Sequence, residues 1–325
     1  LNMKIYHYIA VALLFLSGFC THVIAAEDKL SSLIIDGQNN HNVWPKSTVM
    51  MKQYLEQSGL FTVDVYRTKP TWRGEEHPEQ YKKHSDESQF HVEVPIADPT
   101  FAPTFSNYDV IISNFGNTAA AWPTETEKAF EDYMKNGGGF VSVHAADNAF
   151  PKWKEFNKMI GVGGWGDRDE TAGPHLYYSD DNRLIIDNTK GAAGTHGDIH
   201  ELEITKRNDH PILAGLPDQW MHSKDECYGN LRGPAENMTI LATANCALEF
   251  NDTGKHEPMI MTIDYGKGRI FHTAMGHNDI SLSSVGFITI FLRGTEWAAT
   301  GKVSQDIPID FPTVRHATTR PFKTP

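Results

Sequence analysis

The feature that most constrains the fold is a short apolar strand that begins in a triple glycine and ends on a histidine. Residues 137–146 read Gly-Gly-Gly-Phe-Val-Ser-Val-His-Ala-Ala. A helix expected over 124–136 leads into this strand, and helical spacing resumes near Pro151, which predicts a strand-to-helix turn of an α/β fold. Such turns lie at the carboxyl edge of a parallel sheet, where open α/β folds bind ligands. His144 is therefore a candidate site residue at a turn where some hydrolases carry serine.

Strands and helices are expected to alternate through the first half of the chain. Apolar runs predict strands at 33–37, 108–112 and 139–144, and an alternating pattern predicts a strand at 61–66. Helices are expected over 45–58 and 124–136. Thr124 and Glu127 have the spacing of a capping box at the second helix. This alternation predicts a mostly parallel sheet with helices on both faces. The polar segment 68–103 is too long for a plain connection and suggests a surface excursion or lid.

The second half is less periodic and predicts an antiparallel extension of the sheet. Strands are expected at 202–205, 238–243, 258–264 and 268–274, and a closing helix at 284–299. The turn at 265–268 joins two of these strands, so at least one pair should be antiparallel. Since no linker is visible, we expect one domain over residues 27–325.

The first 26 residues have the pattern of a secretory signal peptide. Lys4 supplies a positive charge, residues 9–19 form an apolar run, and residues 23–26 end in two alanines. An anchoring helix is disfavoured because the run is short and acidic residues follow it. We expect a periplasmic or secreted protein.

Charge and cysteine content limit the classes of partner and of chemistry. The net charge of −12 argues against nucleic acid or an anionic membrane surface as partner. Signal cleavage would leave Cys227 and Cys246, which could pair in an oxidising compartment, although the sequence does not give the separation that pairing needs. A catalytic role for Cys227 is the less favoured alternative.

Polar residues follow the ends of the predicted parallel strands. Asn39 and His41 follow the first strand, Asn114 the third, and His144 and Asn148 the fourth. Because the carboxyl ends of parallel strands share one edge, these residues should lie in one crevice. Asparagines at strand ends are also ordinary turn residues, but three such ends together favour a site.

Two further groups of residues suit proton transfer or ligand binding. The segment 222–228 places Asp225 and Glu226 beside a histidine and Tyr228, and His277 lies beyond another predicted strand. For Asp225 and Glu226, a solvated charged loop is the alternative. In the glycine-rich loop 161–168, Trp165 and Arg168 suit a sugar ring.

The sequence permits a metal but does not specify one. No HExxH and no paired CxxC motif occurs, so a divalent metal such as zinc is possible but no cofactor is assigned. The Gly-x-Gly at 161–163 lacks a preceding strand and is rejected as a dinucleotide-binding motif.

Taken together, these motifs resemble the trehalose-utilisation (ThuA-like) family. The matching stretches cover about residues 32–300 and are 137–146, 210–217, 225–228, 265–270 and 276–277. The resemblance implies a flavodoxin-like, glutamine amidotransferase-like fold and a role in carbohydrate catabolism, including oxidised (3-keto) sugars or glycosides. His144 stands where amidotransferases carry their nucleophilic cysteine, so glutaminase activity is not implied.

The sequence therefore predicts an exported enzyme that acts on a sugar or glycoside by hydrolysis, elimination or isomerisation. His144 and Glu226 are expected to handle protons, and His277 to orient the substrate. The residues expected to bind the substrate are Asn39, His41, Asn148, Trp165, Arg168, Asp225 and Tyr228. A non-catalytic carbohydrate-binding protein and a metal-dependent hydrolase are the alternatives. The expected partner is a small saccharide, and a homo-oligomer is left open.

Overall fold

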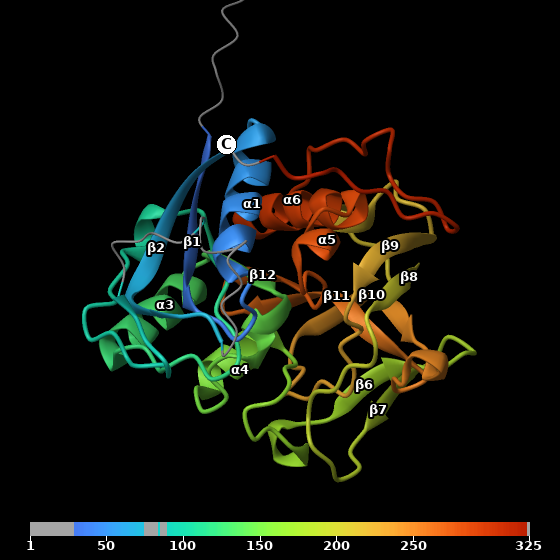
Figure 1. Cartoon of the computed structure of the whole chain (residues 1–325), viewed down its shortest axis with the longest axis horizontal. Helices are drawn as coiled ribbons and strands as arrows, with labels where there is room; N and C mark the ends of the chain where they lie inside the picture. The colour runs from blue at the N-terminus through green and yellow to red at the C-terminus, as the bar shows by residue number, and fades with distance from the viewer. Residues whose placement is uncertain (1–28, 75–83, 85–89, 324–325) are drawn as a thin grey trace, which may run out of the picture.

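The computed structural model describes residues 29–74, 84 and 90–323 (Figure 1). The predicted signal peptide lies outside these residues. Within the described part of the chain, no helix combines the length and the apolar character needed to span a membrane.

The first half of the chain forms the parallel part of one twelve-stranded sheet. The strands lie in the order β3 (Phe90–His91), β2 (Phe61–Trp72), β1 (Leu30–Gln38), β4 (Val110–Ser113), β5 (Gly139–Val143) and β12 (Gly268–Thr273). All five neighbouring pairs are parallel. Apart from the edge strand β3, this is the 2-1-3-4-5 order of flavodoxin-like sheets, as predicted. Both faces of β4 and β5 are buried, which explains their uninterrupted apolar sequences.

The antiparallel extension follows on the other side of β12. Its strands are β11 (Lys255–Tyr265), β10 (Met238–Cys246), β8 (His200–Lys206) and β9 (Gln219–Asp225). Tyr265 pairs with Gly268 across the predicted turn. The hairpin of β6 (His175–Tyr178) and β7 (Leu184–Asp187) pairs with β11 beside this path. The pattern did not predict β6, β7 or β9.

Two groups of helices pack against the sheet. The helices α1 (Trp44–Gln57), α5 (Asp279–Leu282) and α6 (Val285–Thr300) contact one another, and Figure 1 shows them together at the top of the view. The helices α3 (Thr124–Lys135) and α4 (Lys154–Ile160) lie in the lower part of that view and contact β12. Helices therefore cover both faces, as expected for an α/β sheet.

The predicted capping box at α3 is wrong. The N-cap residue is Pro123, and no side chain makes a capping hydrogen bond. Since Thr124 is already the first helical residue, its hydroxyl lies one position too late to cap the free N–H groups. The carbonyl of Pro123 instead accepts from the main-chain N–H groups of Thr126 and Glu127.

The strand β1 contains a β-bulge near its carboxyl end. The register with β2 shifts between Asp36 and Gln38, and Gly37 has a φ of 127°. A Cβ atom on Gly37 would lie 2.0 Å from Oγ1 of Thr68, so only glycine fits. β2 itself continues to Trp72, six residues beyond its predicted end. Residues 75–83 and 85–89 of the predicted excursion lie outside the described part.

Candidate functional site

Three histidines and one glutamate from four chain segments meet at the carboxyl edge of the parallel strands. His41, His144 and His277 follow β1, β5 and β12, and Glu226 follows β9. Oε2 of Glu226 lies 2.9 Å from Nδ1 of His277, 3.6 Å from Nε2 of His144 and 3.9 Å from Nε2 of His41. One ligand atom from each residue lies within 4.8 Å of all the others. The structure thus brings together His144, Glu226, His277 and His41, which were all predicted site residues.

His144 is held by the turn that the sequence indicated. It starts a short 3₁₀ segment at the end of β5 and has a φ of 47°, a left-handed conformation that histidine adopts more readily than most residues. Nδ1 lies 2.7 Å from the carbonyl oxygen of Ala274, and the ring stacks on Tyr228 at 4.1 Å. Its Nε2 atom is buried and makes no hydrogen bond within the described part of the chain.

His41 is oriented by Asn39, which was predicted to bind substrate. The Asn39 amide nitrogen donates to the carbonyls of Asn114 and Phe115, which leaves Oδ1 as the acceptor. That oxygen accepts from the main-chain N–H of His41 and lies 3.3 Å from its Nδ1. Asn39 is buried, so its contacts indicate that it positions His41.

Asp225 holds the two loops that carry Glu226 and His277. Its Oδ1 accepts from the main-chain N–H groups of both residues, at 2.9 and 3.0 Å. Its Oδ2 accepts from the N–H of Gly276 at 2.8 Å and lies 2.9 Å from Nε2 of His222. Burial raises the pKa of Asp225, but His222 and these donors outweigh burial and lower it. The carboxylate is therefore a buried anion that fixes both loops.

Burial and mutual contacts set the charges in the cluster. Burial raises the pKa of Glu226, but the three histidines around it outweigh burial and hold the pKa well below its usual range. Burial lowers the pKa of His41 to about 4. Burial also acts to lower the pKa of His144, but Glu226 and Asp225 outweigh it and raise the pKa. Glu226 is thus ionised and His41 neutral at neutral pH.

The other predicted substrate-binding residues contact one another, and one of them, Tyr228, stacks on His144. Tyr228 is buried, and its hydroxyl accepts from the Asn148 amide at 3.3 Å, while Trp165 packs on the Tyr228 ring. The Arg168 guanidinium donates to the carbonyls of Asn148, Ala149 and Gly164. These contacts indicate that Arg168 and Asn148 hold the main chain and the Tyr228 side chain in place next to His144.

A polar cavity of about 640 Å³ opens beside His41 and His277. The other residues that line it are Asn40, Asn42, Val43, Trp72, Gly74, Asn117, Thr118 and Asn278. None of these residues is ionisable, and four carry a carboxamide. Carboxamides donate to and accept from hydroxyl groups, and an indole offers an apolar face, so the cavity suits an uncharged polyhydroxylated ligand.

His196 is a functional candidate that the sequence analysis missed. Its Nε2 lies 3.7 Å from Oε1 of Glu226, whereas the other three histidines make their ion-pair contacts with Oε2. Its Nδ1 lies 3.0 Å from the carbonyl oxygen of Gly197, and its side chain is 42% exposed. Residues 188–199 have no regular periodicity, so no pattern pointed to this histidine.

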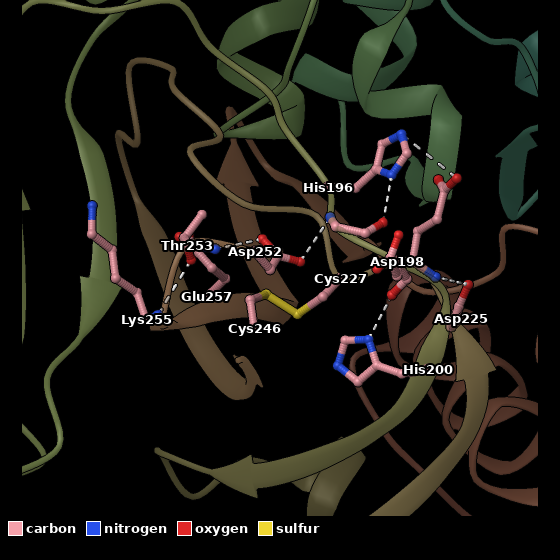
Figure 2. The surroundings of a disulfide bond; sticks show 12 residues. His196, Asp198, His200, Asp225, Cys227, Cys246, Asp252, Thr253, Lys255 and Glu257 are labelled. Atoms are coloured by element: carbon pink, nitrogen blue, oxygen red, sulfur yellow. Dashed lines mark hydrogen bonds and ion pairs between the residues drawn. A yellow bond between two sulfur atoms is a disulfide. The ribbon is translucent and has the colours of Figure 1, made fainter. Parts of the chain in front are cut away.

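Cys227 and Cys246 form a disulfide next to the cluster. Figure 2 shows this bond between the end of β10 and the segment that follows Asp225, and the two Cα atoms are 5.5 Å apart. The pairing that the sequence left open is thereby present, and the alternative of a nucleophilic Cys227 thiol is wrong because its sulfur is bonded. The disulfide anchors the residue directly after Glu226.

The cluster of His41, His144, Glu226 and His277 could hold a metal ion. A second group of potential ligands, Cys227, Cys246 and Asp252, has both sulfur atoms in the disulfide. The structure thus offers the four-residue cluster as its candidate metal centre within the described residues.

Comparisons with known proteins match this chain to one protein family. The trehalose-utilisation (ThuA) family model matches residues 33–298. A solved ThuA-like protein from Parabacteroides merdae is 40% identical, with a TM-score of 0.78 over 90% of this chain and 98% of that chain. A second, from Bacteroides uniformis, is 17% identical, with a TM-score of 0.52 over the same shares of each chain, and supports the fold. A search of curated proteins found no match.

Proposed function

We propose that this chain, which belongs to the trehalose-utilisation (ThuA) family, is an enzyme that acts on a sugar or glycoside at the cluster around Glu226. Family membership supports a role in carbohydrate utilisation. The observation that carries the proposal of catalysis is the convergence of three imidazoles and one ionised carboxylate beside a cavity whose described lining, apart from His41 and His277, has no ionisable side chain. Perturbed ionisable groups that meet in a cleft are typical of active sites.

The cavity favours a neutral sugar as the substrate. Asn40, Asn42, Asn117 and Asn278 can each bind a hydroxyl group as donor or acceptor. Oδ1 of Asn117 is buried and makes no hydrogen bond within the described residues, so it is available as an acceptor. A phosphorylated or carboxylated sugar would find no cationic Lys or Arg among the lining residues that the structure describes.

The groups present suit proton transfer next to a ketone. In a 3-keto sugar, a base removes the proton from the hydroxyl-bearing carbon beside the carbonyl. The C–H electrons form a C=C bond, and the C=O π electrons move to the carbonyl oxygen, which gives an enediolate. Oε1 of Glu226 and Nε2 of His196 lie 3.7 Å apart, and we propose that these two groups accept and transfer this proton. The enediolate can then lead to isomerisation or to elimination of a neighbouring substituent.

Exchange and turnover assays test this proposal. The purified protein should convert a 3-keto disaccharide, and in D2O it should introduce deuterium beside the carbonyl, as seen by NMR and mass spectrometry. The unoxidised disaccharide should undergo no such exchange, because its C–H bonds are not acidic. Saturable sugar binding without exchange or turnover would contradict catalysis and favour the non-catalytic alternative.

The proposal includes export to the periplasm or beyond. The pattern of Lys4, the apolar run 9–19 and the small residues at 23–26 supports it. The buried Cys227–Cys246 disulfide also supports it, because such bonds persist mainly in oxidising compartments. N-terminal sequencing of protein from its native host should begin near residue 27, whereas a chain that retains Lys4 would contradict export.

A further inference from the structure

The neighbours of His144 and His41 determine which ring nitrogen of each histidine carries the proton. A carbonyl oxygen only accepts, so Nδ1 of His144 must carry the proton in its 2.7 Å contact with Ala274. The same reasoning applies to Nδ1 of His41, because Oδ1 of Asn39 is an acceptor. In their neutral forms, both rings therefore present the lone pair of Nε2 to the cluster.

These lone pairs point toward a negative charge. Nε2 of His144 and Nε2 of His41 lie 3.6 and 3.9 Å from the same oxygen, Oε2 of Glu226. Nδ1 of His277 lies 2.9 Å from that oxygen, yet it makes no hydrogen bond of acceptable geometry. Lone pairs that face a carboxylate in a buried site repel it unless a cation lies between them.

A proton on His144 alone leaves the Nε2 lone pair of His41 facing the carboxylate, and protons on further rings are a poor source of positive charge. The ring centroid of His41 lies 4.9 Å from that of His144 and 4.8 Å from that of His277. Two or three imidazolium ions at this separation would repel one another strongly in a poorly solvated site. A single ion with two positive charges avoids this repulsion and contacts all four groups.

The spacing and the supporting contacts fit a metal centre. Zinc lies about 2.0–2.2 Å from nitrogen and oxygen ligands, so two of its ligand atoms lie about 3–4 Å apart. The separations of 2.9–3.9 Å between Oε2 and the three nitrogens agree with this spacing. Metal-binding histidines usually donate their second N–H to a carbonyl or carboxylate. The carbonyl of Ala274 and Oδ1 of Asn39 fill that position here.

We propose that His41, His144 and His277 bind a divalent transition-metal ion together with Oε2 of Glu226. The ligand atoms are Nε2 of His41 and His144 and Nδ1 of His277. Three imidazoles and one carboxylate suit zinc and its first-row neighbours better than magnesium or calcium, which prefer oxygen ligands. When bound, such an ion polarises a substrate carbonyl or lowers the pKa of a bound water.

This inference concerns the same site as the proposed function, but it does not depend on turnover. Oε1 of Glu226 stays outside the ligand set and faces His196, so metal binding and the proton-transfer role use different oxygens of one carboxylate. The cavity beside His41 and His277 leaves the metal site open to a ligand from that side.

Metal titration of the untagged, chelator-stripped protein tests the inference. Calorimetry with Zn²⁺ should show one ion per chain, and Co²⁺ should give the visible absorption of a nitrogen- and oxygen-coordinated site. Glu226→Gln and His277→Asn should each weaken Zn²⁺ binding by at least about tenfold. His277 is 22% exposed, which makes its substitution the safer one for folding. Circular dichroism checks that each variant is folded.

His196→Gln is the matched control, because His196 also faces Glu226 but lies outside the ligand set. It should bind one Zn²⁺ per chain with nearly unchanged affinity. Absence of a stoichiometric site, or affinity that survives both Glu226→Gln and His277→Asn, would overturn the inference. Metal binding without sugar turnover would contradict the proposed function alone, and sugar turnover by a protein that shows no stoichiometric Zn²⁺ site would contradict the metal inference alone.

Discussion

Glu226→Gln is expected to lower turnover of the 3-keto disaccharide by about 100-fold or more while the protein stays folded. Glutamine keeps the shape of the side chain but removes the charge that three histidines and His196 surround. The variant loses both the proton-accepting oxygen and the anionic ligand. Steady-state kinetics should show the loss mainly in kcat, because the carboxamide-lined cavity still binds the sugar.

Glu249→Gln provides the matched control, because Glu249 is exposed and lies outside the cluster. Its kinetics should equal those of the parent protein. Equal kcat values for Glu226→Gln and Glu249→Gln would exclude Glu226 from catalysis.

Asp225→Asn is expected to lower the free energy of unfolding by about 3 kcal/mol. Both carboxylate oxygens of Asp225 accept hydrogen bonds from main-chain N–H groups, and one also contacts His222. An amide nitrogen in place of either oxygen would face donors, so the site would lose hydrogen bonds and bury unpaired polar groups. Urea unfolding measures the change.

Asp218→Asn is the comparison for this stability prediction. Asp218 is exposed and directly precedes β9, the strand that ends at Asp225. Its substitution should change the free energy of unfolding by less than about 0.5 kcal/mol. Similar small effects of both substitutions would contradict the structural role of Asp225.

The parallel half of the fold could be predicted because its signals are local. The strands β4 and β5 are buried on both faces and read as continuous apolar runs. His144 directly follows such a run, so its place at the carboxyl edge followed from the parallel order alone. The same reasoning brought His41 to that edge.

The antiparallel half was harder to predict because its strands carry polar residues inward. β9 buries His222, Ser223 and Asp225, which in sequence resemble a charged loop. Their burial depends on partners distant in sequence, such as Ser284 for His222. A local pattern carries no information about such pairs.

Side-chain roles were less predictable than positions. Arg168 in a glycine-rich loop suggested sugar binding, but its guanidinium donates to main-chain carbonyls. Conversely, His196 lies in an irregular segment and contacts Glu226 only through the tertiary fold. Both cases show that the contacts of a loop side chain depend on the surrounding fold.

Anomalous X-ray diffraction from crystals grown with zinc, recorded on both sides of the zinc absorption edge, tests the central claim most directly. The account predicts one strong peak per chain, within about 2.0–2.2 Å of Nε2 of His41, Nε2 of His144, Nδ1 of His277 and Oε2 of Glu226. An ordered cluster without a peak, or a zinc ion bound only by other residues, would contradict the proposed metal site.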